Sequence, residues 1–193
     1  MITSALGAGN VTPAARDFAA ALGRLGVSHV VTVPDNTSAP LLRALADPGG
    51  GPPLRTVFAT REGEAMGLAA GLWLGGGTPS VLIQNTGLLE AGDALRGTLA
   101  RMGAPVPLLV TCRGYPKARS AGVDPGAGIG DGSILVRNDL DSVAHMTEPT
   151  LRAWGIPFQY LRDPGDLSAL DQVFTRALED GRPVALLLDT SFN

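Results

Sequence analysis

Short apolar runs rich in β-branched residues alternate along this chain with longer stretches in which apolar residues recur at helical spacing. The short runs predict strands at residues 28–33, 55–59, 80–84, 106–112, 157–161 and 183–188. The longer stretches predict helices at residues 12–25, 37–45, 62–74, 88–102, 147–154 and 167–180. The first of these carries typical boundary residues, with Thr12 and Pro13 at its start and Gly26 at its end.

This alternation of strand and helix indicates the fold class. Strands that are apolar throughout, and that are joined by helices, are typical of a parallel sheet covered on both faces. We therefore predict an α/β fold, in which a single doubly wound domain has a mostly parallel sheet of about six strands flanked by helices. The sequence of 193 residues is sufficient for one such domain, with a core from about residue 12 to residue 189.

The loops after the first four strands are the expected ligand-binding segments. In sheets of this kind, ligands bind at the carboxyl ends of the strands. The segments 34–38, 60–64, 85–90 and 113–133 should therefore meet at one edge of the sheet. The last of them is long and rich in glycine and proline, which is typical of a functional loop.

Composition narrows the classes of function. The net charge is −3 and no basic stripe is present, so we expect no nucleic acid partner. No apolar run approaches the roughly 18 residues needed to cross a bilayer, and the first ten residues do not resemble a secretion signal, so we expect no membrane association and a cytoplasmic location. The single cysteine, Cys112, is expected to be a buried structural thiol. One cysteine and two histidines are too few ligands for a zinc cluster, so we predict no metal ligands.

The segment TREGEAMGLAAG, residues 60–71, is the most informative. Glu62 begins a predicted helix that otherwise carries small residues, which allow another backbone or a second subunit to approach closely. We therefore expect Glu62 to lie at the edge of an apolar interface. Taken alone, it could also be an ordinary acidic residue of a first helical turn.

Four segments together carry a resemblance to a known family. Glu62, Ala65, Ala69 and Gly71 match the spacing of the pyrimidine-binding motif of thiamine diphosphate enzymes. The segment VLIQNTGL resembles the QNSGL region of phosphonopyruvate and sulfopyruvate decarboxylases, and VVTVPDNTSAPLLRAL and LRAWGIPFQYL resemble their first loop and a late segment. The resemblance extends over roughly residues 13–189.

The resemblance implies a role for Glu62 in catalysis and in cofactor binding. In the family, this glutamate hydrogen-bonds the pyrimidine ring of thiamine diphosphate and drives its amine into the imino form. The imine then generates an ylid that attacks a 2-keto acid, and the cofactor accepts the electrons as carbon dioxide leaves. The resemblance also implies that Pro34, Asn85, Thr86 and Gly87 bind the cofactor, although 85–87 could be a plain turn between a strand and a helix.

Three further residues are implied as substrate-binding. Asp35 and Asn36 belong to the loop after the first strand, although they could equally form a helix-capping turn. Arg113 precedes Gly114 as in the related decarboxylases, and it could pair with an acidic group of the substrate. We expect Arg119 to be solvated, and His145 to cap or pack against the helix at 147–154.

Enzymes of this family also need a diphosphate-binding domain that holds magnesium through a Gly-Asp-Gly motif and a later asparagine. Residues 130–132 read Gly-Asp-Gly and Asn138 follows, but the spacing leaves no room for a helix between them. We interpret this match as a coincidence. The resemblance then implies a separate diphosphate-binding (beta) subunit, which would hold the diphosphate and Mg2+.

The predicted function is that of a pyrimidine-binding subunit of a decarboxylase acting on a 2-keto acid. An acyloin-forming carboligase of the same family needs the same Glu62, so the sequence leaves both open. A non-catalytic binding or regulatory module with the same fold is a third possibility. A flavodoxin-like nucleotide binder is disfavoured, because VPDNTS stands where a phosphate-binding glycine loop would follow the first strand.

Overall fold

A computed structural model describes residues 11–47 and 54–192 of the chain, and its centre is a parallel sheet. The strands are β1 (His29–Thr32), β2 (Arg55–Phe58), β3 (Pro79–Gln84), β4 (Pro107–Thr111), β5 (Phe158–Leu161) and β6 (Val184–Leu188). They are arranged in the order β2-β1-β3-β4-β6-β5, and every neighbouring pair is parallel. The predicted α/β fold with about six strands is confirmed.

Helices cover both faces of the sheet. They are α1 (Pro13–Arg24), α2 (Ala39–Ala46), α3 (Glu62–Leu74), α4 (Asn85–Glu90), α5 (Gly92–Leu95), α6 (Tyr115–Ser120), α7 (Val143–Ala153) and α8 (Ser168–Asp180). Three short segments complete the set: a π-helix at Arg96–Ala100 and two 3₁₀ turns, η2 (Pro125–Ala127) and η3 (Ser133–Val136). None of the helices in the described ranges is long and apolar enough to cross a membrane.

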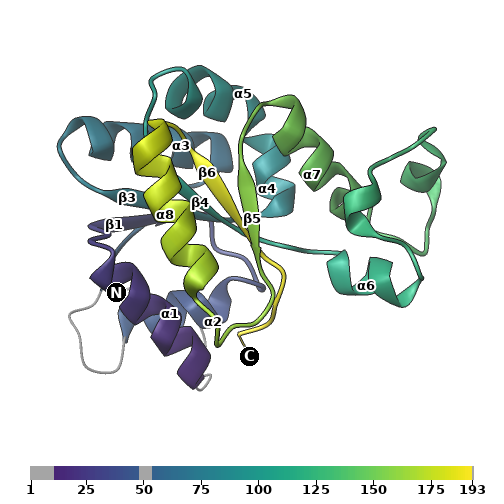
Figure 1. Cartoon of the computed structure of the whole chain (residues 1–193), viewed down its shortest axis with the longest axis horizontal. Coiled ribbons are helices and arrows are strands. Elements are labelled where there is room, and N and C mark those ends of the chain that lie inside the picture. The colour runs from purple at the N-terminus through teal and green to yellow at the C-terminus, as the bar shows by residue number, and fades with distance from the viewer. Residues whose placement is uncertain (1–10, 48–53, 193) are drawn as a thin grey trace.

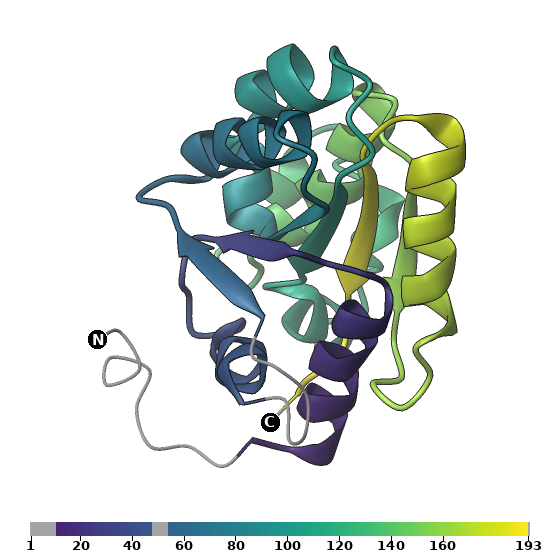
Figure 2. The same ribbon diagram turned by 90° about the vertical axis from the view of Figure 1, so that its left-hand side faces the viewer.

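The two faces of the sheet bury separate hydrophobic clusters. In β3, Leu82 faces the cluster formed with α1, α2 and α8, whereas Val81 and Ile83 face the cluster formed with α3, α4 and α5. This alternation follows from the period of two along a strand. Figures 1 and 2 show α1 and α8 on one side of the sheet and α3, α4 and α5 on the other.

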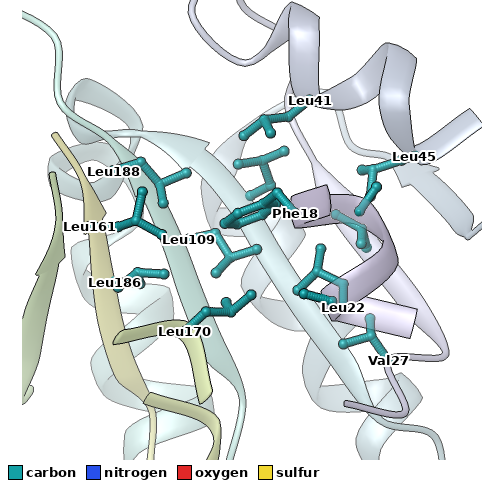
Figure 3. Packing of buried hydrophobic residues seen from close by; sticks show 14 of the residues in the cluster. Phe18, Leu22, Val27, Leu41, Leu45, Leu109, Leu161, Leu170, Leu186 and Leu188 are labelled. Atoms are coloured by element: carbon teal, nitrogen blue, oxygen red, sulfur yellow. The ribbon is translucent and has the colours of Figure 1, made fainter. Parts of the chain in front are cut away.

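The first cluster positions the helices that flank β1. Phe18 and Leu22 of α1 pack towards Leu109 and Leu186 of the sheet, and Leu41 of α2 closes the cluster from the side (Figure 3). Burying one such side chain stabilises the fold by about 1.5–3 kcal/mol. This packing fixes both ends of the loop that leads from β1 to α2.

The helix predicted at 88–102 is wrong in outline. The chain enters α4 at Asn85, directly from β3, and continues through α5 into the π-helix. The change of segment falls at Gly92, where a Cβ atom would lie 2.6 Å from the ring of Trp154. The Trp154 indole therefore packs closely against the backbone at the point where α4 gives way to α5.

The segment between β4 and α7 stands out from the body of the molecule (Figure 1). The expected long loop contains α6, η2 and η3. Helix α7 starts at Val143, four residues before the predicted start, and inside it the Thr147 hydroxyl donates to the Val143 carbonyl at 2.7 Å. His145 is therefore a buried packing residue in the first turn, which is one of the two expected roles, and not a cap that precedes the helix.

Candidate active site

Segments that follow four strands converge at the carboxyl edge of the sheet. The Gln84 amide at the end of β3 donates to Asp35 at 3.1 Å and to Thr37 at 3.2 Å, which links this strand to the loop after β1. Asn85 bonds to the backbone of Arg113, which links β3 to the segment after β4. The expected meeting of these loops is therefore present in the structure.

Glu62 is the first residue of α3 and is half-buried. Its side chain lies against Gly87 in the first turn of α4, where an added Cβ would overlap the carboxyl group. The Glu62 carboxylate makes no hydrogen bond or ion pair with any residue in the described ranges 11–47 and 54–192. An acceptor that is partly shielded from water and not used within the fold is available to a ligand.

The acidic neighbours of Glu62 have structural partners instead. Glu90 accepts from the Arg61 guanidinium at 2.9 Å and from the Gly63 backbone N–H at 2.8 Å, and these bonds hold the pKa of Glu90 below its usual value. Glu64 accepts from the hydroxyl and the backbone N–H of Thr60, which likewise lower the pKa of Glu64. These contacts fix the start of α3 and so the position of Glu62.

Asp35 forms an Asx-type turn at the start of α2. Its carboxylate accepts from the backbone N–H groups of Thr37 at 2.7 Å and Ser38 at 3.2 Å, and from the Ser38 hydroxyl at 2.7 Å. The flanking residues Pro34 and Asn36 are exposed. The carboxylate of Asp35 is therefore engaged within the fold, whereas Pro34 and Asn36 lie next to it on the surface.

Asn85 is completely buried and serves as a bridge between elements. Its amide nitrogen donates to the Arg113 carbonyl at 3.0 Å and to the Thr147 hydroxyl at 3.1 Å, and its oxygen accepts from the Arg113 N–H at 3.2 Å. Thr86 is exposed, and its hydroxyl donates to Gln84 at 3.1 Å. Asn85, Thr86 and Gly87 are thus the first turn of a helix and not the start of a loop.

A cavity of about 350 Å³ lies beside these segments, at the ends of β4 and β6. Arg113 lines it, and the Arg113 guanidinium donates to Asp141 at 2.8 Å. Cys112 also lines it, and burial raises the pKa of the Cys112 thiol far above its usual value, so the thiol is neutral. A volume of this size suits a small-molecule ligand.

Asp189 is a residue of this cavity that the sequence analysis missed. It follows β6 directly, and its side chain is only 1% exposed. Arg119, which we expected to be solvated, forms an ion pair with Asp189, and this hydrogen bond raises the pKa of Arg119. The only signal in the sequence is an aspartate directly after an apolar strand, in LLLDTS.

The Gly-Asp-Gly segment at 130–132 lies in the exposed arm. The Asp131 carboxylate accepts from the Ser133 backbone N–H at 3.0 Å, and this bond lowers the pKa of Asp131. Asp131 therefore begins the turn η3. Within the described ranges, no cluster of three or more histidine, cysteine or acidic side chains is arranged to hold a metal ion.

Comparison with known proteins points to one family. A family model described as "Thiamine pyrophosphate enzyme, N-terminal TPP binding domain" matches residues 13–132. Phosphonopyruvate decarboxylase of Streptomyces viridochromogenes is 39% identical over 103 residues, which is 53% of this chain and 25% of that protein. The chain thus matches only about a quarter of that relative's length.

A second relative is matched over most of its length. Sulfopyruvate decarboxylase subunit alpha of Methanothermobacter thermautotrophicus is 28% identical over 170 residues, which is 86% of this chain and 90% of that subunit. Among solved structures, benzoylformate decarboxylase of Polynucleobacter necessarius superposes with a TM-score of 0.61 at 18% identity, over 92% of this chain and 30% of that protein. The structural likeness concerns the fold.

Proposed function

The chain belongs to the family of thiamine pyrophosphate enzymes, through their N-terminal cofactor-binding domain, and we propose that it is the pyrimidine-binding subunit of a split enzyme that decarboxylates a 2-keto acid. The observation that carries this proposal is the Glu62 carboxylate, which is half-buried at the carboxyl edge of the sheet and has no partner within the described part of the chain. Gly87 provides the space that this side chain occupies.

The residues at this edge fit the aminopyrimidine of thiamine diphosphate. Glu62 would share a proton with a ring nitrogen, since a carboxylate that is partly withdrawn from water is a suitable proton acceptor and donor. The exposed residue Thr86 would line one side of the ring. When bound, the cofactor supplies an electron sink for the loss of carbon dioxide from a 2-keto acid.

The same helix that begins with Glu62 supports a partner subunit. Its outward face consists of Gly67, Leu68, Gly71 and Leu74, and Leu74 is 66% exposed. Such a face is apolar along about two turns, as at subunit interfaces. The matched relative is named as an alpha subunit. We propose that a separate beta subunit covers this face, binds the diphosphate and holds Mg2+.

The proposal is tested on the chain reconstituted with its diphosphate-binding partner. We expect Glu62→Gln to lower the rate of 2-keto acid decarboxylation by about 10²- to 10⁴-fold, because the amide cannot exchange the proton. Glu179→Gln is the matched control, since it removes the same charge from an exposed position on α8, away from Glu62, and should retain activity.

Product analysis with and without an added aldehyde completes this test. Release of carbon dioxide and an aldehyde identifies a decarboxylase, whereas an acyloin identifies the carboligase alternative. Full activity in the Glu62→Gln complex would exclude the catalytic role of this carboxylate and favour a non-catalytic module. Thermal unfolding of both variants checks that each is folded.

A further inference from the structure

The arginines that line the cavity beside the candidate site are each paired with a carboxylate. Its two cationic lining residues are Arg113 and Arg119, and each already has a carboxylate partner. Arg113 pairs with Asp141 at 2.8 Å, and Arg119 pairs with the buried Asp189. Neither arginine is therefore left with an uncompensated charge for a ligand.

Charged groups of opposite sign flank the cavity without lining it. Arg162 approaches the same Asp189 carboxylate at 3.5 Å, but its guanidinium stacks on Tyr160 at 3.9 Å and does not line the cavity. Asp35 is hydrogen-bonded to the cavity residue Thr37 and adds a negative charge near the rim.

The remaining lining is uncharged. Leu188, Phe192 and Pro116 provide apolar surface, and Thr37 and Thr111 provide hydroxyl groups that hydrogen-bond to each other at 2.8 Å. The burial that raises the pKa of Cys112 keeps that thiol neutral as well. A negatively charged group placed here would lose its hydration without gaining a free cation.

The cavity is connected to the candidate cofactor site by one short row of polar contacts. Thr86 bonds to Gln84, and Gln84 bonds to Thr37, which lines the cavity. Gly87, the next residue after Thr86, touches Glu62. The cavity and the Glu62 carboxylate are therefore linked through residues 84–87 at the same edge of the sheet.

We propose that this cavity receives the tail of the 2-keto acid and selects tails that carry no negative charge. This inference rests on the proposed function and specifies its substrate class. It separates the chain from the two relatives above, whose names refer to phosphono- and sulfo-substituted pyruvates. Asp141 and Asp189 are then specificity-determining residues, since they neutralise the arginines that would otherwise attract a second anionic group.

The test uses the complex of the full chain with its diphosphate-binding partner, and 2-oxobutanoate and 3-phosphonopyruvate as probes. We expect kcat/KM for 2-oxobutanoate to exceed that for 3-phosphonopyruvate by at least about tenfold. Asp141→Asn and Asp189→Asn should each shift this ratio about 3- to 10-fold towards 3-phosphonopyruvate, because the first leaves Arg113 and the second leaves Arg119 and Arg162 without a carboxylate partner.

Two features keep the test decisive. Glu179→Gln removes the same charge from an exposed position of α8, away from the cavity, and should leave the ratio unchanged. Asp189 is buried and its variant could lose the fold, but the Asp141 side chain is 27% exposed, so Asp141→Asn tests the inference alone. A ratio that both folded variants leave unchanged, or a wild type that prefers 3-phosphonopyruvate, would overturn the inference.

Equilibrium binding of the same two probes separates this inference from the proposed function. If the complex decarboxylates neither probe but binds 2-oxobutanoate more tightly, in a manner that Asp141→Asn reverses, the selectivity of the cavity stands and the proposed function fails. If the complex decarboxylates both and neither variant alters their relative binding, the proposed function stands and the selectivity inference fails.

Discussion

The backbone of Gly87 lies so close to the side chain of Glu62 that no Cβ atom fits between them. Two segments that follow different strands are therefore interlocked at one point of the sheet edge. The contact places the Glu62 carboxyl group beside the first turn of α4, where a cofactor ring can reach it. The identity of residue 87 should thus matter as much for activity as the identity of residue 62.

Gly87→Ala tests this relationship. We expect the new methyl group to displace the Glu62 side chain and to lower the decarboxylation rate of the reconstituted complex by at least about tenfold, since misplacing a catalytic group costs rate steeply. The stability of the chain should change little, because alanine favours the helical turn by up to about 1 kcal/mol and offsets the crowding. Steady-state kinetics and thermal unfolding measure the two effects.

Gly97→Ala is the matched control for this substitution. Gly97 also lies in a helical segment, and nothing within 4 Å would meet an added Cβ. This variant should retain full activity. Equal activity of the Gly87→Ala and Gly97→Ala complexes would contradict the proposed role of the Gly87 contact.

Asn85 should contribute to stability, because its amide is buried and fully bonded. We predict that Asn85→Ala lowers the free energy of unfolding by about 2–4 kcal/mol, since the Arg113 backbone groups and the Thr147 hydroxyl lose their partner inside the protein. Thr86→Ala, at the exposed neighbouring position, should change it by less than about 0.5 kcal/mol. Urea unfolding of both variants checks this, and similar values for the two would contradict the bridging role.

Local patterns in the sequence predicted most of the fold. The bounds of α3 were predicted correctly, because Glu62 begins a run of mainly small and apolar residues without proline, and Gly75 ends it. The strands were predicted within one residue at each end, since each is an apolar run with a clear stop. The parallel order followed from their alternation with helices.

What the sequence did not predict depends on contacts between distant residues. The start of α4 at Asn85 is set by hydrogen bonds to Arg113 and Thr147, which no local pattern contains. The pairing of Arg119 with Asp189 joins residues 70 apart in the chain. Local sequence patterns treat Arg119 and Asp189 as isolated polar residues, so their pairing can be seen only once the fold is known.

The Arg61–Glu90 contact predicts a pH dependence of stability. The pKa of Glu90 is lower in the folded chain than its ordinary value of 4.5, so the carboxylate form stabilises the fold. This contribution is present above pH 4.5 and is lost as the pH falls through the lowered pKa. We expect it to be below about 1 kcal/mol, because the pair is exposed to solvent.

The measurement for Glu90 compares the unfolding free energies of wild type and Glu90→Gln from pH 7 to pH 3. The wild type should be more stable at pH 7, and the difference should shrink towards pH 3. Glu179→Gln, an exposed site on α8, provides the baseline. A difference that stays constant over this range would show that Glu90 titrates with its ordinary pKa.

The outward face of α3 predicts how the chain assembles. Leu74 is 66% exposed and lies at the end of the outward face that it forms with Gly67, Leu68 and Gly71, so Leu74→Arg should place a charge in the proposed interface. We expect this variant to weaken association with the beta subunit by at least about tenfold, since burying an unpaired charge is costly. Leu178→Arg is the matched control, because Leu178 is 69% exposed and belongs to α8, which packs on the other face of the sheet from α3. Size-exclusion chromatography of each variant mixed with the partner measures association, and loss of assembly with Leu178→Arg but not Leu74→Arg would move the interface away from α3.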